Sequence, residues 1–416
     1  MGRPLLVSGE LTNDMSSLGT ARAVTKHSIS RPALRVEVIS DYPAFLNLEP
    51  VWSRLVAEAE LDHPFLEHSW ARTWWECFGA GSQLHILLVT AGDRPVAIAP
   101  LILTKSRMWG IKARRLGFLY NSHVPRADFI ISHRSGHRSE EAYAAIWRHL
   151  LTNRRWDLLQ LCQLPEGSGT LEAIPRLASE DGYRVGFWQS GASPFVPLDT
   201  TWPLYCEGLA AKHRANLRNR FKRLERVGAV EVETIASGST LTDAIEDGLG
   251  LEGAGWKKEA GTAIACDENL ARFYSTFALR AAERGWLRLH FLDSGLKRVA
   301  FDYSLKYQNR LFLLKLGYDP AFAPYSPSNL LLAKVLESAF EQGVEKYDFL
   351  GETADWKQCW TKESTPNYWL FVFAGTFKGR LLHLLKFRLA PLLKHYGFGH
   401  LRGLASRLGS LAQRRT

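Results

Sequence analysis

Residues 326–329, Ser-Pro-Ser-Asn, have the types and spacing of a phosphate-binding helix start. Ser326 can occupy the N-cap and Pro327 the first helical position, and a helix that starts there leaves backbone N–H groups unpaired. Those groups and the helix dipole both favour negative charge. The loop therefore indicates a phosphate-bearing ligand. The same residues are also ordinary caps in proteins that bind nothing, so both interpretations stay open.

Two strands, a helix and a further strand must hold this loop in place. Apolar runs predict strands at residues 299–307 and 311–317, before the loop, and a buried strand that ends at residues 347–352. Apolar side chains recur at helical spacing after Pro327, and Gly343 is predicted to end that helix. The strand pair thus leads straight to a helix N-terminus.

An earlier part of the chain shows a similar order of elements. A helical aromatic segment contains Trp70 and Trp74 one turn apart, and we expect both side chains in the core. The predicted strands of this part are residues 34–39, 84–90, 96–103, 156–161 and 183–188. In the second part, a strand at 286–292 and a Gly-containing turn precede the strand at 299–307. The repetition indicates a weak internal duplication.

The length of 416 residues is too great for one ordinary core and suits two domains, and 46% hydrophobic residues can fill both. The Pro-rich segment 194–199 is the predicted connector between them. We therefore predict four segments, which are a disordered leader (1–33), an N-terminal domain (34–193), a C-terminal domain (194–376) and a basic amphipathic helical tail (377–416).

Cysteine usage and hydropathy favour a cytoplasmic location. The five cysteines are single, with neither a CxxC pair nor a histidine at metal-ligand spacing, which favours a reducing compartment and no metal. No apolar run approaches the ~20 residues that cross a bilayer. The first 30 residues lack the charged start and apolar core of a signal peptide.

The net charge of +10 is concentrated in the tail. Residues 364–416 contain nine Lys and Arg and no acidic residue, so the rest of the chain is close to neutral. Leucines lie between these charges, which predicts basic amphipathic helices. Peripheral contact with the inner face of a membrane and packing on the second domain are equally open.

A second basic segment lies at residues 212–226, where Arg214, Arg218 and Lys222 follow one another at four-residue spacing. Leu217, Phe221 and Leu224 form the apolar face that would anchor this helix. The basic ridge is either a solvated face or an anion-binding wall. No GxSxG elbow, Walker loop or GxGxxG after a strand is found, which disfavours serine hydrolysis, nucleotide hydrolysis and hydride transfer.

The order of short motifs resembles the GNAT N-acetyltransferase superfamily. It is most similar to the BioF-like acetyltransferases, the group of the cellulose-biosynthesis protein CelD, and also to the FemAB-type transferases, which carry two such domains in tandem. The resemblance covers residues 51–373. The motifs are Asn216-Leu217-Arg218, Gly255-Trp256-Lys257, Phe301-Asp302-Tyr303-Ser304, Gly317-Tyr318-Asp319, Ser326-Pro327, Tyr347-Asp348-Phe349 and Trp356-Lys357.

The resemblance implies an α/β (α+β) fold of tandem GNAT-like domains, each with a mixed, mostly antiparallel twisted sheet flanked by helices. It also implies acetyl-CoA or another acyl-CoA as co-substrate. Its pyrophosphate would lie at Ser326, Pro327, Ser328, Asn329 and Leu330. Ser328 stands where the family usually has glycine; it still supplies a backbone N–H and adds a hydroxyl donor.

The resemblance further implies that an amine or hydroxyl of the acceptor attacks the thioester, with a carboxylate as base. The candidate bases are Asp302, Asp319, Asp348 and Glu352, and each can instead be a cap or an ion-pair partner. Tyr318 or Tyr303 would donate to the leaving thiolate. The residues predicted to bind phosphates or an anionic acceptor are Arg214, Arg218, Trp256, Lys257, Trp356 and Lys357.

Three functions follow in order of preference. The first is an acetyl-CoA-dependent acyltransferase that acts on a sugar, polysaccharide or cell-envelope precursor, as in exopolysaccharide biosynthesis. The second is a FemAB-like transferase that uses aminoacyl-tRNA, with the basic helix at 212–226 as the RNA contact. The third is a non-catalytic polysaccharide-biosynthesis scaffold at the membrane surface.

Overall fold

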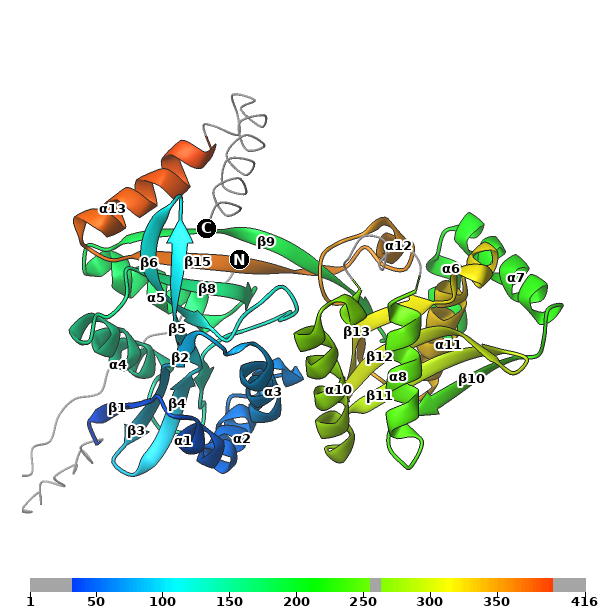
Figure 1. Ribbon diagram of the computed structural model, residues 1–416, viewed down its shortest axis with the longest axis horizontal. Coiled ribbons are helices and arrows are strands. Elements are labelled where there is room, and N and C mark those ends of the chain that lie inside the picture. Colours follow the sequence, from blue (N-terminus) through cyan, green and yellow to red (C-terminus); the bar gives the residue numbers. More distant parts are fainter. Residues whose placement is uncertain (1–31, 255–262, 392–416) are drawn as a thin grey trace, which may run out of the picture. The chain divides into compact units, whose positions relative to one another are not determined.

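An eleven-stranded sheet runs through the unit Ala33–Thr416 and is accompanied by a four-stranded sheet (Figure 1). The structure is a computed structural model and describes residues 32–254 and 263–391. The strand orders are β10-β11-β12-β13-β14-β9-β15-β8-β6-β5-β2 and β1-β3-β4-β7. Most neighbouring strands are antiparallel and helices flank the sheets, which confirms the predicted fold class.

The first half of this unit contains nine of the strands and five of the α-helices that the structure describes. The strands are β1 (Leu34–Ile39), β2 (Ser82–Leu84), β3 (Ile86–Ala91), β4 (Arg94–Ala99), β5 (Leu101–Met108), β6 (Ile111–Phe118), β7 (Ile130–Ile131), β8 (Leu158–Pro165) and β9 (Arg184–Pro197). The helices are α1 (Tyr42–Asn47), α2 (Glu49–Glu58), α3 (His68–Phe78), α4 (Ser139–Thr152) and α5 (Gly169–Glu180), and a 3-10 turn, η1, spans Pro64–Leu66.

The second half begins with the helices α6 (Trp202–Gly208) and α7 (Ala211–Glu225). Its strands are β10 (Val230–Ile235), β11 (Leu287–Ser294), β12 (Lys297–Tyr307), β13 (Arg310–Tyr318), β14 (Lys346–Asp348) and β15 (Ser364–Phe373). Its other helical elements are α8 (Leu241–Glu252), η2 (Ile264–Cys266), α10 (Glu268–Glu283), η3 (Pro320–Tyr325), α11 (Pro327–Glu341), α12 (Asp355–Gln358), α13 (Phe377–Leu384) and the π-helix η4 (Leu385–Leu389).

Most local predictions are confirmed. The strands predicted at 299–307 and 311–317 are β12 and β13, and the helix after Ser326 is α11, with Gly343 just beyond its end at φ 64°. Trp70 and Trp74 are buried, as expected from their spacing. In α7, Leu224 is fully buried and Leu217 and Phe221 are partly buried, so the predicted apolar face anchors this basic helix.

The prediction of a connector at 194–199 is wrong for its first four residues, because Pro194–Pro197 belong to β9. One part of this long strand pairs with β15, and its end pairs with β14 through Phe195, Val196 and Pro197. In turn β15, late in the chain, pairs with β8 of the first half. Each half thus contributes one strand that pairs with a strand of the other half. Backbone pairing, which proline tolerates at a strand end, overrides the linker signal here.

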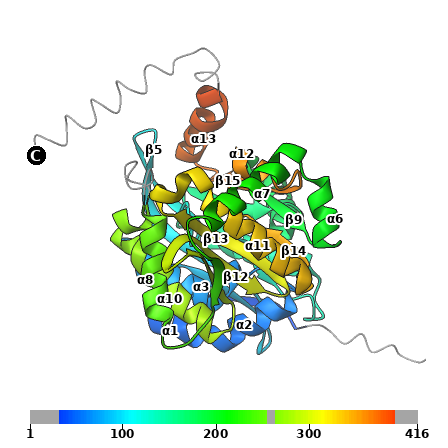
Figure 2. The ribbon, with the colours of Figure 1, turned by 90° about the vertical axis from the view of Figure 1, so that its right-hand side faces the viewer.

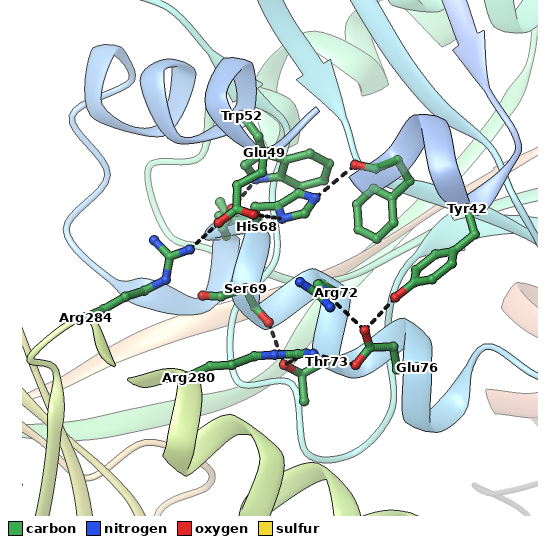
Figure 3. Close-up of polar contacts among 12 residues, drawn as sticks. Tyr42, Glu49, Trp52, His68, Ser69, Arg72, Thr73, Glu76, Arg280 and Arg284 are labelled. Carbon is green, nitrogen blue, oxygen red and sulfur yellow. Dashed lines mark hydrogen bonds and ion pairs between the residues drawn. The ribbon is translucent and has the colours of Figure 1, made fainter. Parts of the chain in front are cut away.

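The two halves also meet through α3 and α10. Trp70 packs edge-to-face on Phe273 and Phe277, at ring-centroid distances of 5.1 and 4.7 Å. Figure 3 shows the polar rim of this contact, where Arg280 donates to Thr73 (2.7 Å) and to Glu76 (2.8 Å). Although burial acts in the opposite direction, hydrogen bonds from Tyr42, Arg72 and Arg280 lower the pKa of Glu76. The aromatic core and its charged rim fix the first half against the second.

Helices cover both faces of the strands that form the centre of the second half. Figure 2 shows α8 and α10 on one face of β12 and β13 and α11 on the other. Leu331, Leu332 and Leu336 of α11 are fully buried on the sheet. This arrangement brings the C-terminal end of α8 and the N-terminal end of α11 to the same end of β13, where Gly317 lies.

Candidate active site

The parallel strands β13 and β14 pair over only three residues each and then separate. Arg310, Leu311 and Phe312 pair with residues 346–348, and no further pairs follow. A cavity of about 490 Å³ opens between the separated ends. Its walls come from both strands, from the end of α8 and from the start of α11. We call this space the splay cavity.

The N-terminus of α11 lies at the splay cavity through Ser328 and Asn329. Ser326 occupies the N-cap position, as predicted, but its side chain makes no capping bond, and its backbone is left-handed with φ 49°. Its carbonyl accepts from the N–H groups of Asn329 (3.0 Å) and Leu330 (3.3 Å). The first turn of α11 contains no acidic residue, so the helix dipole is not neutralised there.

The wall of the splay cavity beyond β14 is a strained turn held by Lys357. Leu350 and Gly351 have φ of 51° and 57°, a region that a leucine rarely adopts. The Lys357 ammonium donates to the carbonyls of Leu350 (2.6 Å) and Glu352 (2.8 Å). Burial lowers the pKa of Lys357 to about 8. Lys357 therefore positions this turn, and strain of this kind often accompanies a functional site.

Glu252, the last residue of α8, brings a carboxylate to the splay cavity. Its side chain is 2% exposed and accepts a hydrogen bond from the Ile264 N–H (2.9 Å). The close approach depends on Gly317 of β13, because a Cβ there would lie 2.5 Å from the Glu252 backbone. A glycine on one element thus places a carboxylate on another.

A second cavity, of about 470 Å³, lies beside the first and shares Leu314, Lys315, Leu350 and Gly351 with it. We call it the acceptor cavity. Most of its other lining residues come from the first half, and several are neutral and polar, namely Tyr120, Ser122, Gln163, Ser190, Ser193 and also Asn367 of β15. Asn367 is 4% exposed, and its Oδ1 has no hydrogen-bond partner within the described part of the chain. A buried acceptor atom of this kind favours a ligand that donates a hydrogen bond.

His123, Tyr274 and Lys315 meet where the two cavities join. The His123 Nδ1 lies 3.0 Å from the Tyr274 hydroxyl and 3.2 Å from the Lys315 ammonium. Burial and then the charge of Lys315 lower the pKa of His123 to about 4, so the imidazole is neutral at pH 7. Burial and then the charge of Glu252 raise the pKa of Tyr274. His123 lies in a loop, and Glu252, Tyr274 and Lys315 come from three separate elements, so sequence spacing gave no signal for them.

Two of the predicted bases are buried structural groups. Asp302 is fully buried and accepts from Ser304 (2.5 Å) and Tyr347 (2.9 Å), and burial raises its pKa to about 7. Asp348 forms a buried ion pair with Arg126 at 2.6 Å. Neither residue lines the splay or the acceptor cavity.

The other two predicted bases lie in different places. Asp319 caps η3 through the Ala321 N–H (2.9 Å) and pairs with Lys297 (2.6 Å), whose hydrogen bond lowers the pKa of Asp319. Glu352 is exposed and lines the acceptor cavity. Of the two predicted thiolate donors, Tyr318 lines the splay cavity, whereas Tyr303 is buried and donates to the Tyr274 carbonyl (3.3 Å).

The predicted binding residues separate into three groups. Trp356 and Lys357 line the splay cavity, as Ser328 and Asn329 do, and Pro327 is buried. Arg214, Arg218 and Leu330 line a different groove of about 430 Å³ between α6, α7 and α11, and Arg214 also donates to the Glu207 carbonyl (2.8 Å). Trp256 and Lys257 lie outside the described residues, as do most of the predicted leader and tail.

The described part of the chain has neither a cluster of metal ligands nor a membrane-spanning helix. Residues 32–254 and 263–391 contain no group of three or more His, Cys, Asp or Glu side chains that could hold a metal ion. Within the same ranges, none of the helices combines the length and the apolar character that crossing a membrane requires.

Comparison with known proteins identifies the domain that carries the splay cavity. Residues 211–358 match the acetyltransferase (GNAT) domain family. No curated protein matches the sequence. Among solved structures the chain is similar to FemX, at 13% identity and a TM-score of 0.53, over 84% of this chain and 99% of FemX.

A conserved protein of unknown function from Bacteroides thetaiotaomicron VPI-5482 is also similar, at 12% identity and a TM-score of 0.50, over 82% of this chain and 100% of that one. At these identities the structural similarity concerns the fold alone. The matched residues include the splayed parallel strands β13 and β14 and the helix α11 that starts between them. Residues 211–358 are therefore identified as an acetyltransferase (GNAT) domain by the family match, and the chain shares its fold with FemX.

Proposed function

We propose that this protein is an acyltransferase that moves an acyl group, most simply acetyl, from a coenzyme A thioester to an amine or hydroxyl. The observation that carries the proposal is the junction of two cavities at the splay, with the buried Glu252 carboxylate on one wall. A donor in the splay cavity and an acceptor in the acceptor cavity would meet at this junction. Holding both reactants in one geometry supplies much of the catalysis in such transfers.

The residues of the splay cavity fit an acyl thioester. Leu313, Leu314 and Leu316 of β13 offer an apolar wall for the pantetheine and acyl chain. The start of α11 offers the Ser328 backbone N–H and an uncompensated dipole for the pyrophosphate. Ser328 is helical here and bonds weakly to the Gly317 carbonyl (3.4 Å), so the departure from the family glycine causes no backbone strain.

The reaction would exchange a C–S bond for a C–N or C–O bond and involve two proton transfers, one to a base and one to the leaving thiolate. The acceptor nitrogen or oxygen attacks the thioester carbonyl and loses its proton to Glu252, and the C–S bond breaks as the new C–N or C–O bond is retained. The thiolate would then take a proton from Tyr318, which lines the same cavity. His123, neutral at pH 7, accepts from Lys315 through Nδ1 (3.2 Å), so its Nε2–H would donate a hydrogen bond to the acceptor.

The acceptor is proposed to be a sugar, polysaccharide or cell-envelope precursor. Hydroxyl and amide side chains dominate the polar lining of the acceptor cavity, and such groups bind polyhydroxylated molecules. The unpartnered Asn367 Oδ1 would accept from a hydroxyl of this ligand.

A thermal-shift panel of acetyl-CoA, longer acyl-CoAs and free CoA tests the donor. A ligand at about 100 times its Kd adds about 2.7 kcal/mol to the free energy of unfolding, so a binding donor raises Tm clearly. The absence of a shift with every member of the panel would overturn the proposal.

A FemAB-like transfer from aminoacyl-tRNA is the second candidate, because α7 exposes Arg218, Lys222 and Arg223 as a basic ridge. Binding of RNA by this ridge would weaken steeply between 50 and 200 mM salt, on the order of a hundredfold or more, whereas binding of a single coenzyme would change far less.

A further inference from the structure

The turn between β5 and β6 has an unusual residue at its tip. Trp109 and Gly110 have φ of 53° and 80°, which is the backbone of a two-residue hairpin turn with both residues left-handed. Asn, Asp and Gly are the usual residues at the first of these positions, and a bulky side chain is costly there. The Trp109 side chain is 50% exposed. The fold therefore keeps a strained tryptophan in contact with solvent, which favours a role in binding.

Positive charge surrounds this tip. Lys105, Arg107 and Lys112 are exposed, and no acidic residue occurs between Arg94 and Ala127. None of these three cations has a carboxylate partner among the residues that the structure describes. The nearest ion pairs on this side join Asp157 to Arg114 (3.7 Å) and to Lys378 (2.8 Å).

The helix α13 lies beside the hairpin, as both ribbon views show (Figures 1 and 2). Its inner face packs on the sheet through Leu382, in a cluster that also contains Met108 and Ile111 next to the tip. Its outer face exposes Phe377 (84%), Leu384 (46%) and Leu389 (41%) of the helix and η4, and the cations Arg380 and Arg388 lie among them. Aromatic, leucine and basic side chains thus alternate on the exposed side of both elements.

We propose that the β5–β6 tip and the outer face of α13 together form a docking surface for an anionic lipid bilayer. Exposed Trp, Phe and Leu among exposed Lys and Arg match the interface of such a membrane, where aromatic rings enter the headgroup region and cations meet anionic lipids. A nucleic acid would satisfy the cations, but it would leave Leu384 and Leu389 in water. The proposal rests on surface residues alone and does not depend on the proposed acyl transfer.

Sedimentation of the full chain with vesicles tests this surface. We expect binding to vesicles that contain 30% phosphatidylglycerol, little binding to pure phosphatidylcholine, and weaker binding at high salt. Trp109→Asn keeps a residue that the turn favours, so the fold is retained, and it should reduce binding at least severalfold. The matched control is Phe187→Thr, which removes a 57% exposed aromatic next to Trp188 of β9. Trp188 lies on the α13 side of the sheet. Because successive strand residues face opposite sides, Phe187 faces away from the proposed docking surface.

The charged part of the surface has its own test. Lys105→Gln, Arg107→Gln and Lys112→Gln together should weaken binding about a hundredfold, since each cation near an anionic surface contributes roughly fivefold. Equal binding by the Trp109→Asn variant and the native chain would overturn the proposal. So would a loss of RNA binding in the triple variant with unchanged vesicle binding. The 392–416 segment is the same in all variants, so it cannot account for a difference between them.

Discussion

The two halves of the molecule repeat one arrangement and differ in what they leave open. In the first half, the parallel strands β6 and β8 pair over three residues, and α4 lies between them in the chain. In the second half, the parallel strands β13 and β14 also pair over three residues, and α11 lies between them. After β6, the chain returns to β8, where the Ala127 N–H donates to the Gln163 carbonyl (3.0 Å). After β13, the chain turns away into η3, and the splay cavity remains.

The two corresponding helix starts also differ in charge. The first turn of α4 contains Glu140 and Glu141, which neutralise the helix dipole, whereas the first turn of α11 has no acidic residue. The duplicated fold therefore contains one helix start suited to an anion and one that is already compensated. The difference favours the second half for the proposed donor site, whereas the first half contributes walls to the acceptor cavity.

Removal of the Glu252 carboxylate should have the largest effect. Glu252→Gln keeps the shape of the α8 end and should lower kcat by about 10²–10⁴-fold with little change in the acyl-CoA Kd, because a general base contributes on that scale. Glu140→Gln in the first half is the control and should leave kcat unchanged. An unchanged kcat in the Glu252 variant would remove this residue from the mechanism.

The pH dependence of stability should differ between the halves because of Asp302. The strand register places Leu103 of β5 where the second half has Asp302, so the first half carries no such charge. Because burial raises the pKa of Asp302 to about 7, the folded state binds its proton more tightly than the unfolded state does, and stability falls as pH rises from about 4 to about 7.

Asp302→Asn should therefore match the native chain near pH 4 and exceed it at pH 8, by on the order of 2–4 kcal/mol. Urea unfolding at both pH values measures the difference. If the variant is destabilised equally at both pH values, the two hydrogen bonds of the carboxylate, and not its ionisation, determine how much Asp302 contributes to the free energy of unfolding.

Gly317 and Gly117 occupy the same register position in the two halves and offer a matched pair of substitutions. A Cβ at Gly317 would meet the Glu252 backbone at 2.5 Å, and one at Gly117 would meet the Gln160 carbonyl at 2.5 Å. Each Gly→Ala change should cost about 1–3 kcal/mol of stability. Only Gly317→Ala should also lower kcat in the folded protein, because it moves Glu252. Equal kcat in the two variants would contradict the proposed role of this contact.

The smallest expected effect comes from charge at the start of α11. Ser328→Glu would introduce into the second half the acidic first turn that α4 already has, and it should weaken acyl-CoA binding about fivefold to thirtyfold. The fold should not be destabilised, since a carboxylate at a helix N-terminus is favourable. Isothermal titration with acetyl-CoA measures the change, with Ser338→Glu near the other end of α11 as control. Equal affinities of the two variants for acetyl-CoA would show that the pyrophosphate does not bind at the start of α11.

Local pattern determined much of this fold. Apolar spacing predicted β12, β13 and α11 within a few residues, the buried aromatic residues of α3 and the anchored face of α7, because each depends on neighbours a few residues away. The resemblance suggested Asp302, Asp319 and Asp348 as bases, but a carboxylate in the sequence does not reveal whether it caps, pairs or faces a cavity.

Short-range spacing and backbone chemistry were enough to predict the periodic elements and the helix start at Pro327. Only the tertiary structure shows that β9 pairs with β14 and β15 with β8, that Gly317 lets α8 approach β13, and that the charge of Glu252 acts on His123. These residues lie far apart in the chain, and the physical reason they come together is packing between elements, which periodicity within one element does not record.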